Sequence, residues 1–297
     1  MQDIHSLAAQ NVDYLTTCYK DCCACIEAAC LESFENHLRE KGEVTIATFC
    51  GFAFNNTPTG EMYFTGRDAH DLVLSAILQK GAYLNAYERF ETDAEREAHF
   101  SKFKNERAIF DDTFTEGQKF KYLNFNNGQL GIPAFGDFTL AFPLIHFDTD
   151  SLVFLKFNSL TRKDPKSTDK QRYYFTSNNE AVAIEALTQD LATFEHFVPL
   201  IVLKRKDELE NGTDIDYNLL ILKPIEGNLR HRDYVEVITW QNVKIQSGVR
   251  LRTEKERFQA IFDAVSDFDR EHEPMIKNLK ELYELINSSV ITTEYGI

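Results

Sequence analysis

Residues 234–240, with the sequence YVEVITW, have the composition of a buried β-strand, yet they carry a carboxylate, Glu236, between two valines. Successive side chains of a strand point to opposite faces, so the two valines share one face and Glu236 shares the other with Tyr234 and Ile238. A carboxylate is costly to bury without a partner. Glu236 therefore lies either on a sheet face that borders water or in a polar cleft.

The segments around this strand predict an α+β protein. Apolar residues at helical spacing, ended by Gly42 in the first case, predict helices at 1–41, 68–81, 90–114, 178–197 and 253–288. Runs rich in β-branched and aromatic residues predict strands at 43–54, 61–67, 119–144, 151–160, 198–206, 216–225 and 233–245. Two strands joined by a Gly-rich link within 119–144 indicate a hairpin, and the segments 161–172 and 207–214 read as a loop and a turn.

The overall charge bears on which partners are expected. The chain has 297 residues and a formal net charge of −15, so it is not expected to bind nucleic acid or an anionic membrane, which require clustered Lys and Arg. We find no apolar run of the roughly 18 residues that a membrane span needs. The first residues, MQDIHSLAAQNVDYL, also lack the order of a signal peptide.

Five of the six cysteines lie in one short segment. Cys18, Cys22 and Cys25 recur at i, i+4 and i+7, on one face of the predicted helix, and the last two form a C-x-x-C. Zinc sites normally add a second pair of ligands, which this sequence lacks, whereas free Cys packs well as a small hydrophobe. We expect free thiols in a reducing compartment and no metal site, with redox or metal chemistry as the alternative.

A second candidate site lies in TGRDAHD, which places Arg67 and His70 between a predicted strand and a predicted helix. Arg67 is either a surface residue beside a capping Asp, or a planar guanidinium that binds a phosphate near a helix N-terminus.

These segments, in this order, resemble the mono-ADP-ribosyltransferase superfamily, in particular a bacterial branch related to toxins and secreted effectors. The resemblance spans about residues 60–245 and rests on Arg67 followed by LVLSAILQKGAYLNAYERFE, on KFKYLNFNNGQLGIPAFGDFTLAF, and on YVEVIT. It implies an ADP-ribosyltransferase-like split β-sandwich at 43–250, with a helical lobe at about 68–114 over an NAD cleft. Helical regions at 1–42 and 251–297 would flank this domain.

The resemblance also implies roles for individual residues. Glu236 would be the catalytic carboxylate, and Tyr234 stands where family members carry the Glu or Gln that helps to select the acceptor. The residues implied to bind NAD are Arg67, His70, Tyr83, Asp137 and Thr139. The family's Ser-Thr-Ser motif is replaced here by GDFT. Further aromatic candidates to stack on NAD, or to pack in the core, are Tyr87, Phe110 and Phe125.

The function that follows is transfer of ADP-ribose from NAD, as substrate, to a protein side chain, with arginine as the expected acceptor. Such a protein would be made in a bacterial cytoplasm and secreted or translocated into a target cell, where it modifies a host or competitor protein. Two alternatives stay open: an NAD glycohydrolase, in which water is the acceptor, and a non-catalytic interaction module.

Overall fold

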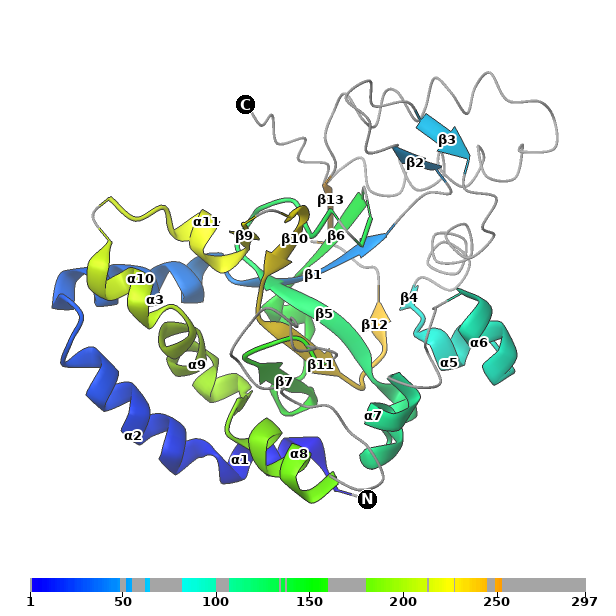
Figure 1. The fold of residues 1–297 in the computed structure, drawn as a ribbon, viewed down its shortest axis with the longest axis horizontal. Helices are drawn as coiled ribbons and strands as arrows, with labels where there is room; N and C mark the ends of the chain where they lie inside the picture. Colours follow the sequence, from blue (N-terminus) through cyan, green and yellow to red (C-terminus); the bar gives the residue numbers. More distant parts are fainter. Residues whose placement is uncertain are drawn as a thin grey trace.

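The protein is an α+β structure with helices on both faces of an antiparallel sheet (Figure 1). A computed structural model describes residues 2–48, 52–54, 62–64, 82–99, 107–133, 135–136, 138–159, 180–212, 214–226, 228–244 and 249–252. The predictions for Arg67, His70, Asp137, the helix at 68–81, the loop at 161–172 and the helix at 253–288 fall outside these residues.

The main sheet has seven strands in the order β13-β6-β1-β5-β11-β7-β8, and every neighbouring pair is antiparallel. In that order the strands are Arg250–Arg252, Phe138–Pro143, Glu43–Thr48, Lys121–Asn126, Glu236–Thr239, Leu152–Leu155 and Leu191–Thr193. Two-stranded pairs of described residues are β2 with β3 (Phe52–Phe54, Met62–Phe64), β4 with β12 (Ala82–Tyr83, Val243–Lys244) and β9 with β10 (Lys223–Ile225, Asn228–Asp233).

The α-helices that the structure describes form three groups along the chain. The α-helices are α1 (Ile4–Gln10), α2 (Val12–Cys23), α3 (Ala28–Lys41), α5 (Ala86–Arg89), α6 (Asp93–His99), α7 (Ala108–Thr113), α8 (Glu180–Thr188), α9 (Phe197–Lys204), α10 (Lys206–Asn211) and α11 (Tyr217–Ile221). Short 3-10 turns lie at Gly117–Lys119, Leu144–His146, Thr149–Ser151 and Phe194–His196. None of the helices described has the length and apolar character of a membrane span.

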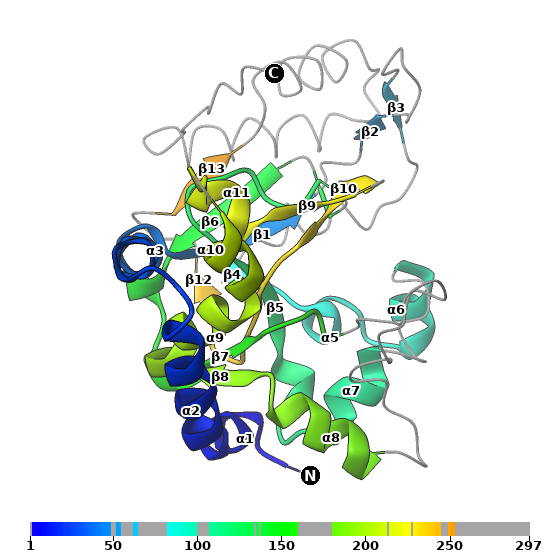
Figure 2. The same ribbon diagram turned by 60° about the vertical axis from the view of Figure 1, so that its left-hand side comes forward.

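Alternating side chains of the central strands enter two separate cores. Val237 and Phe125 face α2, α3 and α9, while Ile238 and Val153 face α1, α7 and α8. Figure 2 shows α2, α3 and α9 together, with α7 at a distance from them. The predicted separation of Val235 and Val237 from Ile238 is confirmed by this division, whereas Tyr234 packs in the core of the two valines and not with Ile238.

The predicted N-terminal helical region is confirmed as three helices. Asp3 caps α1, because its carboxylate accepts hydrogen bonds from the backbone N–H groups of His5 and Ser6. Gly42 ends α3 and donates its N–H to the carbonyl of Leu38. A Cβ at position 42 would lie 2.4 Å from that carbonyl oxygen and 2.9 Å from Cζ of Phe125. Close approach of α3 to the sheet therefore favours glycine there.

The predicted strand at 198–206 is wrong, because most of this segment belongs to helix α9. Its residues are almost continuously apolar, and such a run does not distinguish a buried strand from a buried helix. Five of the eight α9 residues are buried, as expected for a helix enclosed between α2 and the sheet. The adjoining turn predicted at 207–214 is largely helix α10, and 216–225 divides into α11 and β9.

Two further predictions need correction. The strands of 119–144 do not form a hairpin, because β1 lies between β5 and β6 and pairs with both. The Gly-rich link from Asn126 to Phe138 is long enough to pass the end of one strand. The helix predicted at 178–197 ends at Thr188, and β8 follows it to complete the sheet edge beside β7.

Candidate active site

Glu236 begins β11, a central strand, and lies opposite Asn124 on β5 and Leu155 on β7. Its side chain is buried, and its Oε2 accepts a hydrogen bond of 2.8 Å from the backbone N–H of Ser159. Burial raises the pKa of Glu236, and the charge of Arg107 and the hydrogen bonds from Ser159 oppose this rise only in part. The alternative of a solvated carboxylate on an open sheet face is therefore wrong.

Arg107 is the basic group beside this carboxylate. It precedes α7, and its Nη1 donates a hydrogen bond of 3.0 Å to Oγ of Ser159. Its guanidinium carbon lies 3.5 Å from the centre of the Tyr122 ring, a cation–π contact. The side chain is half-buried, and Tyr122, Asp111 and Glu236 act on its charge. Arg107 thus joins Ser159, Tyr122 and the two buried acids in one cluster.

Asp111 is a second buried acid, one helical turn after Arg107. Its two oxygens accept hydrogen bonds from the phenols of Tyr87, at 3.0 Å, and Tyr122. Burial raises the pKa of Asp111 to about 7, although Arg107 and the two phenols favour the charged form. Asp111 therefore titrates near neutral pH.

A row of polar side chains crosses three adjacent strands and ends at Glu236. Thr45 on β1 lies opposite Asn124 on β5, which in turn lies opposite Glu236 on β11. All three side chains point to one face, and Leu155 continues the row as an apolar residue. One face of the sheet is therefore divided into an apolar half, covered by α1 and α8, and a polar half.

Tyr234 is close to Glu236 but has a structural role. Its hydroxyl accepts a hydrogen bond of 2.5 Å from Nδ2 of Asn158, and its carbonyl accepts one of 2.9 Å from Nζ of Lys204. Burial, followed by the charge of Glu236, raises the pKa of Tyr234 well above its usual range. A phenol in this state is a poor proton acceptor at neutral pH.

Thr139, on β6, is separated from β11 by β1 and β5. At a spacing of about 4.8 Å per strand, this places the Thr139 backbone about 14 Å from β11. Its Oγ1 also accepts a hydrogen bond of 2.8 Å from the N–H of Gly131. The structure does not bring Thr139 to Glu236, because the insertion of β1 between β5 and β6 separates them.

The aromatic candidates for stacking on NAD divide into two pairs. Phe125 is fully buried on the face opposite Glu236, and Phe110 is a buried residue of α7, so both are core residues. Tyr83 and Tyr87 are half-buried. Burial raises the pKa of the Tyr83 phenol, and the charges of Arg89 and Arg107 partly oppose this rise. Tyr83 is therefore close enough to Arg107 to feel its charge.

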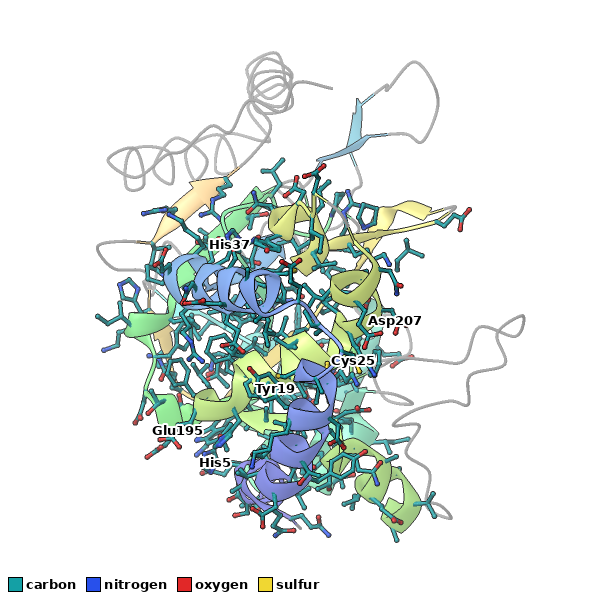
Figure 3. All side chains as sticks on the ribbon, turned by 90° about the vertical axis from the view of Figure 1, so that its left-hand side faces the viewer. His5, Tyr19, Cys25, His37, Glu195 and Asp207 are labelled. Carbon is teal, nitrogen blue, oxygen red and sulfur yellow. The ribbon has the colours of Figure 1, made fainter. Side chains whose placement is uncertain are left out.

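The described cysteines are all free thiols. Cys22 is buried in the core between α2 and the sheet, and burial raises its pKa to about 11. Cys25 is exposed after the end of α2 (Figure 3). Among the residues that the structure describes, no group of three or more His, Cys, Asp or Glu side chains is suited to a metal ion.

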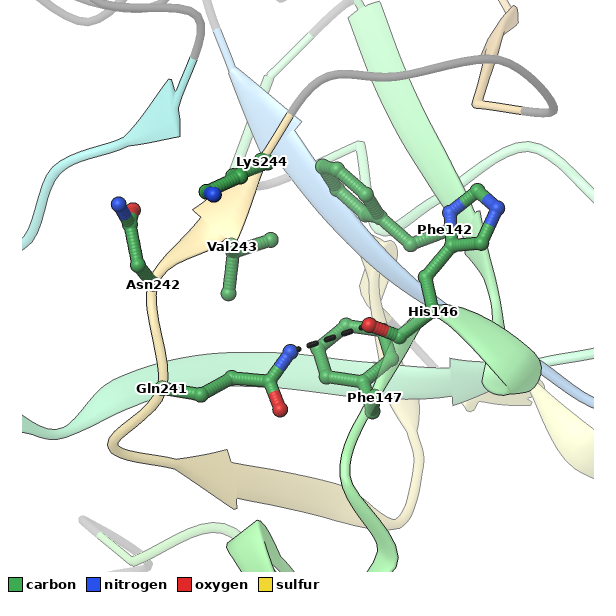
Figure 4. Close-up of a pocket in the computed structure, with 7 residues that line it drawn as sticks. All are labelled: Phe142, His146, Phe147, Gln241, Asn242, Val243 and Lys244. Carbon is green, nitrogen blue, oxygen red and sulfur yellow. Dashed lines mark hydrogen bonds between the residues drawn. The ribbon is translucent and has the colours of Figure 1, made fainter.

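A cavity of about 210 Å³ lies beside β12, away from Glu236 (Figure 4). Gln241 closes one side of it by donating a 3.2 Å hydrogen bond from Nε2 to the carbonyl of His146. Its lining residues are Phe142, His146, Phe147, Gln241, Asn242, Val243 and Lys244. No residue predicted from the sequence to bind NAD lines this cavity.

Comparison with known proteins gives no match to a protein-family model, a curated protein or a solved structure. The candidate site therefore rests on geometry. The sequence analysis missed Arg107, Asp111, Ser159 and Asn124. Only Asn124 had a usable signal, because Tyr122, Asn124 and Asn126 alternate with apolar residues along KYLNFN and mark a polar face.

Proposed function

We propose that the chain is a mono-ADP-ribosyltransferase, a glycosyltransferase that moves ADP-ribose from NAD to a protein side chain. The observation that carries the proposal is the setting of Glu236. It is a buried carboxylate at the start of a central strand, held through one oxygen by Ser159 and placed at the end of a polar row. Burial of a charged group at such a cost is typical of functional sites.

The chemistry gives this carboxylate a clear task. Cleavage of the bond between nicotinamide and ribose C1′ releases neutral nicotinamide and leaves positive charge on the ribose. A fixed carboxylate stabilises this charge as it develops, as in glycoside hydrolysis. A new bond then forms between C1′ and the acceptor, whose proton passes to solvent. Arg67 and His70 would hold the NAD phosphates, and Tyr83 would flank the site.

The finer features implied by the resemblance belong to this proposal. They are the split β-sandwich at 43–250, the helical lobe at about 68–114, the flanking regions 1–42 and 251–297, and a bacterial effector or toxin that is translocated to act on a protein in another cell. The acidic net charge of −15 fits a basic target surface.

A second candidate, an NAD glycohydrolase, is favoured by Tyr234. Transfer to arginine needs a group that accepts a proton from the acceptor guanidinium, and family members carry Glu two residues before the catalytic carboxylate. Tyr234 is buried at that position, its hydroxyl is bonded to Asn158, and its pKa is raised. Water as the acceptor does not require a proton-accepting side chain at position 234, so hydrolysis of NAD would compete with transfer to arginine.

Incubation with NAD labelled on the adenylate, in a cell lysate, tests the proposal. Label on protein supports transfer, and free ADP-ribose without labelled protein supports hydrolysis. Absence of both NAD binding and turnover would leave an interaction module. The exposed Glu195 supplies a matched Glu195→Gln control for Glu236→Gln, because it lies on the surface away from the site.

A further inference from the structure

Asn124 and Glu236 stand side by side on adjacent strands. The N–H of Phe125 donates a hydrogen bond of 2.9 Å to the carbonyl of Val235, so Phe125 and Val235 form the hydrogen-bonded pair of this antiparallel ladder. The next pair, Asn124 and Glu236, is therefore a non-hydrogen-bonded pair, in which side chains lie closest together. Both side chains project from the same face.

In the described structure the Asn124 side-chain amide makes no hydrogen bond within the protein, although most of the residue is covered. The residue is only 6% exposed, and within the described ranges the one hydrogen bond at Asn124 beyond the strand ladder is made by its backbone carbonyl, to Thr45. An amide that makes no hydrogen bond within the protein has its N–H donors and its carbonyl acceptor available to another molecule. Because this amide also lies beside Glu236, a ligand bound by the carboxylate would come within its reach.

Asn126, two residues along the same strand and face, shows the contrast. Its Nδ2 donates to the carbonyl of Gln129 at 3.0 Å, and its Oδ1 accepts from the backbone N–H groups of Asn127, at 2.7 Å, and Gln129, at 3.1 Å. Asn126 holds the turn after β5 together. The Asn124 side chain makes no comparable hydrogen bond, so its amide does not stabilise a turn or a neighbouring strand in this way.

We propose that Asn124 and Glu236 together bind a vicinal diol, with Glu236 accepting a hydrogen bond from one hydroxyl and the Asn124 amide bonding the neighbouring hydroxyl. The backbone N–H of Ser159 holds Oε2 of Glu236 and fixes the position of the carboxylate. An amide offers both a donor and an acceptor, which suits a hydroxyl. The inference rests on the proposed function, under which the diol is that of the nicotinamide ribose of NAD, and it makes Asn124 a specificity residue for the 3′-hydroxyl.

The test uses the full chain, with NAD and an NAD analogue that lacks the 3′-hydroxyl of the nicotinamide ribose. Wild type is expected to bind NAD about three- to tenfold more tightly than the analogue, as for one neutral hydrogen bond. Asn124→Leu, which keeps the side-chain volume, is expected to bind both with the same weaker affinity and to keep the wild-type Tm. Asn126→Leu, the matched control, is expected to lower Tm.

Three results would overturn the inference. If Asn124→Leu binds NAD as tightly as wild type and keeps its preference over the analogue, Asn124 does not contact the diol, although the NAD site stands. If Asn124→Leu lowers Tm as much as Asn126→Leu, Asn124 has a structural role. If wild type binds neither NAD nor ADP-ribose in equilibrium titration, the proposed function fails and the inference fails with it.

Discussion

Arg107 and Glu236 are linked through a single residue. Nη1 of Arg107 lies 3.0 Å from Oγ of Ser159, whose backbone N–H donates to Oε2 of Glu236 at 2.8 Å. The charge of Arg107 also acts on Glu236 and lowers the pKa that burial has raised. The basic residue at the start of α7 thus positions the carboxylate on β11 and favours its ionised form.

Arg107→Gln is expected to raise the pKa of Glu236, because it removes the positive charge that opposes burial. The acidic limb of the pH–rate profile for NAD turnover should move to higher pH, and the side-chain carboxyl signal of Glu236 in an NMR titration should move with it. The exposed Arg39 supplies the control variant, Arg39→Gln. An unchanged Glu236 titration in Arg107→Gln would contradict the link.

Asp111 is expected to make stability depend on pH between about 4 and 7. Its pKa in the folded protein, about 7, lies above the ordinary value of 3.8, so the folded state binds the proton more tightly. The stabilising contribution of protonated Asp111 is complete below the ordinary pKa and is lost as pH rises through 7.

Urea denaturation of wild type and Asp111→Asn at pH 5 and pH 8 measures this contribution. Between these pH values wild type should lose on the order of a few kcal/mol of unfolding free energy relative to Asp111→Asn, which carries no titrating group. If the difference in unfolding free energy between wild type and Asp111→Asn is the same at pH 5 and at pH 8, Asp111 is ionised at both pH values.

Asp233 compensates two buried cations. Its Oδ1 lies 2.6 Å from Nζ of Lys204, and its Oδ2 lies 2.5 Å from Nη1 of Arg205, whose side chains are each 2% exposed. Burial lowers the pKa of Lys204 to about 8 even with Asp233 present. Asp233→Asn should therefore destabilise the protein by about 1–2 kcal/mol, since it leaves two buried cations without their carboxylate, while the 38% exposure of the Asp233 side chain weakens each ion pair.

Chemical denaturation of Asp233→Asn measures this loss, with Asp150→Asn as the surface control, because Asp150 is exposed. A loss no larger than that of the control would mean that the Lys204 and Arg205 cations are solvated or paired elsewhere.

Gly42→Ala is expected to cost about 1–3 kcal/mol, because the added methyl group would overlap the carbonyl oxygen of Leu38 and the Phe125 ring. Gly128→Ala provides a comparison, since its Cβ would meet no atom within 4 Å and the cost there arises only from φ of +103°. If Gly42→Ala has the same Tm as wild type, α3 and β5 separate readily enough to admit the methyl group.

Local sequence patterns predicted the parts of the fold that depend on local chemistry. The helices at 4–41, their end at Gly42 and the strand around Glu236 follow from periodicity and from the glycine that stops the last helix. Helix α9 could not be predicted in this way, because PLIVL is apolar on every side and its enclosure decides its form. The insertion of β1 between β5 and β6 is likewise set by tertiary pairing rather than by the adjoining turn.

The site divides in the same way. Glu236 could be predicted because a carboxylate interrupts an apolar strand, and Asn124 carries the same signal on β5. Arg107 and Ser159 could not, because they come from segments 52 residues apart that meet only through the Ser159 hydroxyl. The positions of Arg67 and His70 stay predictions.

Single-turnover release of nicotinamide from bound NAD, compared between wild type and Glu236→Gln, tests the central claim most directly. Glu236→Gln should bind NAD with near wild-type affinity and release nicotinamide at least about a hundredfold more slowly, because the fixed negative charge is lost while the shape is kept. Nicotinamide release at the wild-type rate from Glu236→Gln would contradict the assignment of Glu236 as the catalytic carboxylate.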